Sequence, residues 1–155
     1  MNGTPGPSLL TRRQALATAA GGLALVVARP ARATPEAMQE LIRTFTGGAK
    51  VTEGRVKLDV TLLVENGNSV PLSVSVESPM TAEDHVVRIG VFNEKNPLPD
   101  VAIFNLTPRC GRATAATRIR LNDTQMITAI AQMKDGTIWS DTSEVIVTLP
   151  ACVEG

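Results

Sequence analysis

Residues 56–76 read VKLDVTLLVENGNSVPLSVSV, with a polar Asn-Gly pair at Asn66 and Gly67. Apolar side chains recur at every second position in residues 56–64 and again in 70–76. A period of two places alternate side chains on opposite faces of a β-strand. Because Asn and Gly tolerate positive φ, the stretch predicts a β-hairpin with a four-residue connection. The decisive fold signal is therefore an antiparallel strand pair.

The rest of the chain repeats this signal. Further strands are predicted at 85–92, 101–106, 113–121, 125–133, 138–140 and 144–149. Clusters of Gly, Pro, Asn and Asp separate them, so short strands follow one another about every 8 to 12 residues. Pro71, which has no N–H to donate, would lie in an edge strand or at a strand start. The predicted fold class is mainly β, an immunoglobulin-like antiparallel β-sandwich with a core of aliphatic side chains.

One short helix is predicted before the strands. Thr34 can cap it, Pro35 fits its first turn, and Gly47-Gly48 would end it. Its apolar residues recur at the spacing of one helix face; they are Met38, Leu41, Ile42 and Phe45. The helix should therefore lie with one face on the sandwich.

The first 33 residues have the features of an export signal. Arg12 and Arg13 precede an apolar, Ala/Gly-rich segment at 15–28, and Ala31-Arg32-Ala33 fits a cleavage site. The apolar segment is shorter than the roughly 20 residues that a membrane span needs. We interpret residues 1–33 as a twin-arginine signal peptide, which predicts a periplasmic mature protein with no membrane span.

Cleavage after residue 33 would remove four arginines and no acidic residue. The fifteen basic and fifteen acidic residues of the chain would become eleven and fifteen. A mildly acidic protein is a poor match for the phosphate backbone, so a nucleic-acid partner is not expected. The remaining 122 residues have the size of one domain. We assign 34–149 to the sandwich with its helix, and 150–155 to a flexible C-terminal arm.

The chain offers few residues for catalysis or cofactor binding. It has one histidine, His85, and two cysteines, Cys110 and Cys152. These are too few nitrogen and sulfur ligands for the usual zinc or haem sites, so neither a metal nor another cofactor is expected. His85 begins an apolar run and is interpreted as a structural residue. No motif of a hydrolase, P-loop or dinucleotide site occurs.

Cys152 is the main candidate functional residue. It lies three residues from the C-terminus, after Pro150, where too little chain follows to bury it. Pro150 is expected to mark the end of the last strand, and the extended tail could carry the thiol about 10 Å from the domain. Glu154 and the terminal carboxylate disfavour a thiolate. An exposed thiol without activation suits a carrier better than a self-activated nucleophile, so no catalytic residue is assigned.

Four alternatives to this interpretation of Cys152 stay open. Cys110, in a turn with Arg109 and Arg112, could be reactive itself, or it could form an intramolecular disulfide with Cys152. The protein could be a periplasmic binding or assembly module in which Cys152 forms an interchain disulfide. A free-standing thiol enzyme is the least favoured, since neither a base nor an oxyanion device is visible.

Together, these features resemble the SoxY family. The resemblance rests on the leader, the short helix, the β-domain, the terminal cysteine and two segments at 117–121 and 135–141. It implies a sulfur-carrying subunit that holds thiosulfate-derived intermediates covalently on Cys152. The implied partners are a SoxZ-like subunit in a heterodimer and, transiently, haem-containing SoxAX-type and hydrolytic SoxB-type enzymes. The protein would then be a carrier acted on by enzymes, not an enzyme.

One feature departs from the family pattern. The usual family tail has two glycines on each side of the cysteine, whereas this chain has Pro150-Ala151 before Cys152 and Val153-Glu154 after it. Glycine gives an arm free rotation and little bulk, while Pro and Val stiffen and thicken it. The departure therefore predicts an altered efficiency or an altered choice of partner enzymes.

Overall fold

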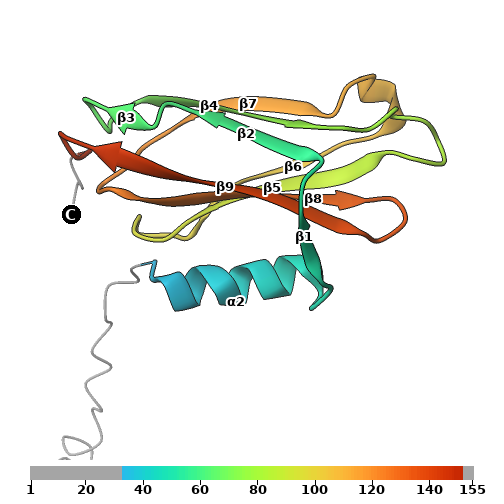
Figure 1. The fold of residues 1–155 in the computed structure, drawn as a ribbon, viewed down its shortest axis with the longest axis horizontal. Coiled ribbons are helices and arrows are strands. Elements are labelled where there is room, and N and C mark those ends of the chain that lie inside the picture. Colours follow the sequence, from blue (N-terminus) through green and yellow to red (C-terminus); the bar gives the residue numbers. More distant parts are fainter. Residues whose placement is uncertain (1–32, 152–155) are drawn as a thin grey trace, which may run out of the picture. The chain divides into compact units, whose positions relative to one another are not determined.

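The structure is a computed structural model, and it describes residues 33–151 (Figure 1). The elements in chain order are α2 (Pro35–Thr46), β1 (Val51–Glu53), β2 (Val56–Val60), β3 (Leu63–Val64), β4 (Val70–Val76), β5 (Val86–Asn93), β6 (Asp100–Asn105), the 3-10 turn η1 (Pro108–Cys110), β7 (Thr114–Ile119), β8 (Gln125–Met133) and β9 (Ile138–Val147). No helix among these residues is both long enough and apolar enough to cross a membrane.

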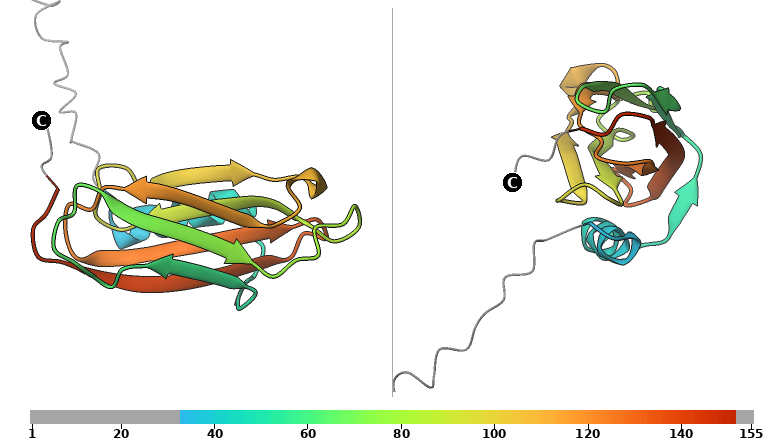
Figure 2. Two further views of the ribbon diagram at one scale, coloured as in Figure 1. Left: turned by 90° about the horizontal axis from the view of Figure 1, so that it is seen from above. Right: turned by 90° about the vertical axis from the view of Figure 1, so that its left-hand side faces the viewer.

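The strands form two facing sheets, as Figures 1 and 2 show. One sheet has the order β2-β4-β7, and the other has the order β1-β9-β8-β5-β6 with β3 also paired to β9. Most neighbours are antiparallel, and only β1 and β3 run parallel to β9. The predicted mainly β, immunoglobulin-like sandwich is confirmed, and β6 and β7 are edge strands at one end of each sheet order.

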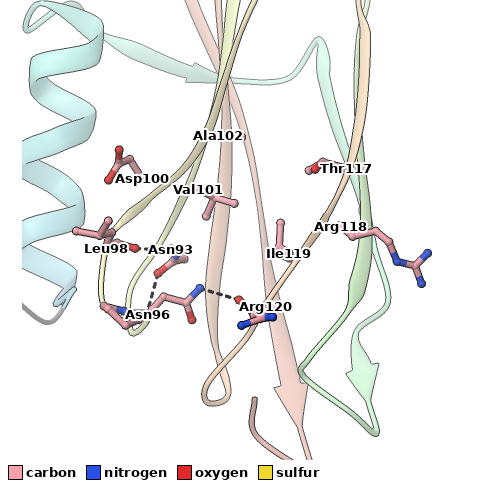
Figure 3. Close-up of a pocket in the computed structure, with 11 residues that line it drawn as sticks. Asn93, Asn96, Leu98, Asp100, Val101, Ala102, Thr117, Arg118, Ile119 and Arg120 are labelled. Atoms are coloured by element: carbon pink, nitrogen blue, oxygen red, sulfur yellow. Dashed lines mark hydrogen bonds between the residues drawn. The ribbon is translucent and has the colours of Figure 1, made fainter. Parts of the chain in front are cut away.

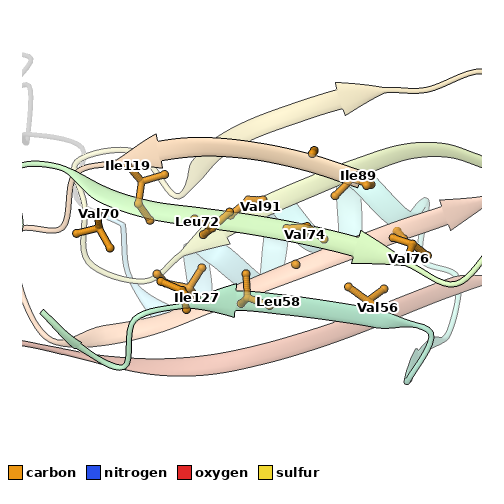
Figure 4. Packing of buried hydrophobic residues seen from close by; sticks show 14 of the residues in the cluster. Val56, Leu58, Val70, Leu72, Val74, Val76, Ile89, Val91, Ile119 and Ile127 are labelled. Atoms are coloured by element: carbon orange, nitrogen blue, oxygen red, sulfur yellow. The ribbon is translucent and has the colours of Figure 1, made fainter. Parts of the chain in front are cut away.

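The core between the sheets is built from the inward half of each alternating strand (Figure 4). In β4, Val70, Leu72, Val74 and Val76 are buried, whereas the residues between them are exposed or half-buried. They pack against residues of the opposite sheet, including Ile89, Val91 and Ile127. The cluster is almost entirely aliphatic, as the low aromatic content predicted, and its burial supplies the main stabilisation of the fold.

The helix α2 forms where its local signals predicted. The Thr34 side chain accepts a hydrogen bond from the Ala37 N–H at 3.1 Å, and Gly47 ends the helix in the left-handed region. Its apolar face packs on the outside of the larger sheet, where the rings of Phe45 and Phe92 meet edge to face at 5.5 Å. The Arg88 guanidinium stacks over the Phe45 ring, which fixes the end of the helix further.

The predicted strand over 56–64 was wrong in its second half. It ends at Val60, and the chain crosses to the other sheet, where Leu63 pairs with Ile146 of β9. The Ile146 N–H donates to the Leu62 carbonyl at 2.8 Å, so this long-range pairing overrides the local alternation. Leu62, expected to face inward, is exposed. The connection between β2 and β4 is therefore residues 61–69, not four residues.

Three smaller features compare with the predictions as follows. Pro71 is the second residue of β4, so it lies at a strand start, which was one of its two predicted places, although β4 is the central strand of its sheet. The two strands predicted at 138–140 and 144–149 are one continuous strand, β9. β1 was not predicted; it is held by its parallel pairing with the start of β9.

Candidate functional site

The candidate carrier residue, Cys152, lies outside the described residues, which end at Ala151 directly before it. The structure does describe the chain that leads to it. This segment follows β9 and lies at the same end of the sandwich as β3 (Figure 1). The described part of the candidate site is therefore the set of residues that hold the base of the tail.

Ala151 is fixed to the domain by a backbone hydrogen bond and by burial. Its N–H donates to the Leu121 carbonyl at 2.9 Å, and only 6% of the residue is exposed. Leu121 follows β7 and is fully buried. The backbone therefore stays on the domain one residue beyond Pro150, the point at which it was expected to leave.

Gly67 joins the tail to Leu121. Its N–H donates to the Leu149 carbonyl at 2.9 Å, and its carbonyl accepts from the Leu121 N–H at 2.8 Å. A Cβ atom at this position would lie 2.1 Å from the Leu121 oxygen and 2.9 Å from the Ala151 nitrogen. Only glycine fits so close an approach. Gly67 is not among the residues with positive φ, so its role is this approach and not the hairpin turn that the sequence predicted.

A further contact holds the chain between β9 and this anchor. The Thr148 N–H donates to the Val64 carbonyl at 2.9 Å, and the Thr148 hydroxyl lies 3.3 Å from the same oxygen. The tail is thus held at Thr148, Leu149 and Ala151, by residues from two other parts of the chain. Such an arrangement fixes the starting point of a short peptide while contributing no acid, base or nucleophile of its own.

Cys110 lies far from this anchor. It is exposed at the end of η1, before β7, whereas Leu121 lies after β7. The six residues of β7, at about 3.3 Å each, separate the two ends by roughly 20 Å. A disulfide needs Cα atoms within about 7 Å of each other, and Ala151, the last described residue before Cys152, lies well beyond this distance from Cys110.

His85 has a structural partner. Its Nδ1 lies 2.9 Å from the Thr81 carbonyl oxygen, which supports the structural role predicted for it. Within residues 33–151, no cluster of three or more histidine, cysteine or acidic side chains has a geometry that could hold a metal ion.

A cavity of about 410 Å³ lies between the edge strands β6 and β7 (Figure 3). Its lining residues are Asn93, Asn96, Pro97, Leu98, Asp100, Val101, Ala102, Thr117, Arg118, Ile119 and Arg120. The Asn96 side-chain amide donates to the Arg120 carbonyl at 2.7 Å and so ties the two walls together. The Arg118 guanidinium points away from the cavity and donates to Ser69 at 2.8 Å. The lining contains no thiol or histidine.

Sequence reasoning did not identify this cavity or the tail anchor. The segment 117–121 was singled out only for its resemblance, yet it forms one wall of the cavity and ends at Leu121, which binds Ala151. Both features depend on pairs of residues far apart in the chain, for which a single sequence carries no signal.

Comparison with known proteins connects this geometry to a family. The sequence model described as "Sulfur oxidation protein SoxY" matches residues 42–152, which spans most of the sandwich and ends at Cys152. A search of the curated proteins gave no match.

Two solved structures share the fold. The sulfur carrier protein SoxY from Chlorobium limicola f thiosulfatophilum superposes with a TM-score of 0.63 at 24% identity, over 75% of this chain and 100% of that chain. The superoxide reductase (neelaredoxin) from Ignicoccus hospitalis has a TM-score of 0.55 at 16% identity, over 61% of this chain and 80% of that chain. At these identities the likeness shows a common architecture, which two differently described proteins share.

Proposed function

The chain belongs to the SoxY family of sulfur oxidation proteins, and we propose that it is a periplasmic sulfur carrier that binds thiosulfate-derived intermediates covalently on Cys152. The observation that carries the proposal is the anchored chain end: the family match runs to Cys152, and the backbone is fixed to the domain up to Ala151. The carrier role of the Chlorobium protein, which has the same fold, supports it.

The chemistry at Cys152 would proceed in four balanced steps. The thiol sulfur forms a bond to the sulfane sulfur of thiosulfate, releasing one proton and two electrons, which a haem-containing SoxAX-type partner accepts. The product is a Cys–S–S–SO₃⁻ adduct. A SoxB-type hydrolase then adds water across the S–SO₃ bond, which releases sulfate and protons and leaves a persulfide on Cys152. A further redox partner then accepts six electrons from the outer sulfur, which takes three oxygen atoms from water and becomes a sulfonate. A second hydrolysis releases this group as sulfate and restores the free thiol.

The domain contributes position and not chemical groups to these steps. A thiol held at the end of a fixed backbone has a high effective concentration at any active site that the domain contacts. We propose that a SoxZ-like subunit forms a heterodimer with the domain, and that the twin-arginine leader exports the pair to the periplasm.

The test is intact-mass spectrometry of the protein purified from thiosulfate-grown cells. We expect added mass on the C-terminal peptide that a reductant removes, and a Cys152→Ser protein that folds but supports no thiosulfate oxidation. The matched control is Cys110→Ser, which should behave as the wild type because Cys110 lies at the far end of β7.

Two results would contradict the proposal. A Cys152→Ser strain that oxidises thiosulfate normally would exclude the carrier role. A reductant-sensitive species with twice the monomer mass, in place of a sulfur adduct, would indicate a binding or assembly module with an interchain disulfide.

A further inference from the structure

An exposed apolar surface surrounds the base of the tail. Large hydrophobic residues exposed among those that the structure describes are Leu62 (60%), Leu63 (59%), Leu98 (62%), Ile103 (50%), Ile146 (49%) and Leu149 (59%). Four of them lie in the segments that hold the tail. We name these four residues, Leu62, Leu63, Ile146 and Leu149, the tail-base patch.

Two members of the tail-base patch are neighbours in the sheet, and Leu62 directly precedes one of them. Leu63 and Ile146 are register partners across β3 and β9, and the Leu62 carbonyl accepts the Ile146 N–H. Their strand neighbours Val64 and Val147 are buried, so Leu63 and Ile146 point to the outer face.

Leu149 extends the exposed apolar residues along the chain to the anchor, and two acidic residues lie beside the patch. Leu149, whose carbonyl accepts the Gly67 N–H, follows β9 two residues before Ala151. Glu144 is exposed and shares the outer face of β9 with Ile146, and Glu65 is exposed after β3. An apolar patch with an acidic rim has the composition of an interaction surface.

The helix α2 does not cover this surface. It buries the outer face of the larger sheet at Phe92, Ile130 and Ile138, near the start of β9. Ile146, near the end of the same strand, is half exposed. The outer face of β9 is therefore packed at one end and open at the end next to the tail.

The position of Cys152 points to the occupant. Cys152 directly follows Ala151, whose N–H is bound to the Leu121 carbonyl. Consecutive Cα atoms are about 3.8 Å apart, so the anchor at Ala151 leaves the thiol only a short reach beyond the domain. An enzyme that acts on the sulfur must bring its reacting groups to about 3 Å from it. Such an enzyme has to contact the domain around Ala151.

We propose that the tail-base patch is the docking surface for the enzymes that act on sulfur bound to Cys152. The partner surface is an apolar active-site entrance bordered by basic side chains, which complement Glu65 and Glu144. This inference rests on the proposed carrier function. To that function the inference adds the surface that the enzymes would recognise on the carrier.

The chain offers a closely matched control for the test. Leu63→Ser with Ile146→Thr removes the centre of the patch, and Leu98→Ser with Ile103→Thr alters residues of nearly equal exposure elsewhere. Each double variant replaces the chromosomal copy in cells that oxidise thiosulfate, and sulfate formation from thiosulfate is measured. We expect the patch variant to lower the rate about tenfold or more, because a few well-packed residues near the centre of an interface carry most of its affinity. The control variant should retain nearly the wild-type rate.

Two measurements distinguish weaker docking from a loss of stability and from a change in the reactivity of the thiol. Urea unfolding midpoints of both variants should match that of the wild type, since all four positions are exposed. In a Cys110→Ser background, iodoacetamide should alkylate Cys152 at the same rate with and without the patch substitutions. A slower alkylation in the patch variant would mean that the patch acts on the thiol itself and would overturn the inference.

Three further outcomes would contradict the docking surface, the carrier function or both. If Cys152→Ser abolishes sulfate formation while the patch variant keeps the wild-type rate, the docking surface is wrong and the carrier function stands. If Cys152→Ser has no effect, the carrier function fails and the inference fails with it. A homodimer, or the complex with the proposed SoxZ-like subunit, that forms with the wild type but not with the patch variant in sedimentation velocity would make the patch a subunit interface and contradict the proposal.

Discussion

Gly67, Leu121 and Ala151 meet at a point that has no space for a side-chain carbon. The hydrogen atom of Gly67 permits the 2.8 Å hydrogen bond to Leu121, and Leu121 in turn binds Ala151. Close packing leaves no space there for an added methyl group. The position of the tail backbone therefore depends on glycine at residue 67.

Gly67→Ala should therefore destabilise the domain and loosen the tail. The new Cβ would lie 2.1 Å from the Leu121 oxygen, so the two segments must move apart. We expect a loss of about 1–3 kcal/mol in the free energy of unfolding, measured in urea. Hydrogen exchange at the Ala151 amide should accelerate more than exchange in β8. Asn68→Ala is the control, because it alters only an exposed side chain in the same loop.

Asp141 is a second residue on which a long-range contact depends, here through its side chain. Its Oδ2 accepts a hydrogen bond from the Leu58 N–H at 2.8 Å, linking β9 in one sheet to β2 in the other. β2 is an edge strand, and this carboxylate occupies one of the donors that the edge would leave free. The contact thus both joins the sheets and protects an edge.

Removal of this carboxylate should be costly. Asp141→Ala leaves a partly buried N–H without its acceptor, and we expect a loss of about 1–3 kcal/mol in unfolding free energy. Asp141→Asn keeps an acceptor oxygen and should lose less. Urea denaturation of both variants measures the difference. Small and equal losses in the two variants would show that the bond does not stabilise the protein.

At the scale of the element, the turn between β8 and β9 is stabilised by one carboxylate. Asp135 Oδ1 accepts hydrogen bonds from the Thr137 hydroxyl at 2.7 Å and from the Thr137 N–H at 2.9 Å. These bonds, the hydroxyl bond first, lower the pKa of Asp135 below its ordinary value of 3.8. Gly136 takes positive φ in the same turn.

The lowered pKa predicts a pH dependence of stability. The folded state favours the ionised carboxylate, so its contribution is complete above the ordinary pKa near 4 and is lost as the pH falls through the lowered folded value. The wild type should therefore lose more stability than Asp135→Asn between pH 6 and pH 3 in urea unfolding. Thr137→Ala should raise the pKa of Asp135 toward its ordinary value in an NMR titration. An unchanged pKa in Thr137→Ala would refute the assigned cause.

Elements whose limits are set by neighbouring residues could be predicted from the sequence. Elements whose limits are set by contacts with distant residues could not. The limits of α2 follow from Thr34 and Gly47, which act on their own neighbours. The break after Val60 depends on the pairing of Leu63 with Ile146, which lies 83 residues away. Gly67 was noticed as a turn residue, but the contact with Ala151 that requires glycine exists only in the folded chain. The family resemblance was predicted from the sequence and is confirmed, whereas the role of Cys152 stays a prediction.

At the scale of the whole molecule, the leader and the domain meet in sequence at a buried residue. Ala33, the last residue of the predicted signal peptide, is 6% exposed, and its N–H donates to the Asn96 carbonyl at 2.9 Å. Cleavage after Ala33 would remove this contact and leave a charged amine on Thr34, the residue that caps α2. A positive charge at a helix N-terminus is unfavourable because of the helix dipole. Processing at the predicted site should therefore lower the stability of the domain slightly.

The predicted leader can be tested in the chain that carries residues 1–33. If residues 1–33 are a twin-arginine signal, Arg12→Lys with Arg13→Lys should strongly reduce export, so that the full-length precursor accumulates in the cytoplasm. Wild-type periplasmic protein should have an intact mass that begins at Thr34, and a chain beginning at Ala33 should be more stable in urea by about 0.5–1 kcal/mol. Replacement of Arg29 and Arg32 by Lys is the control, because both lie outside the arginine pair. Full export of the Arg12 and Arg13 variant would contradict the twin-arginine assignment, and a mass that begins elsewhere would move the boundary between leader and domain.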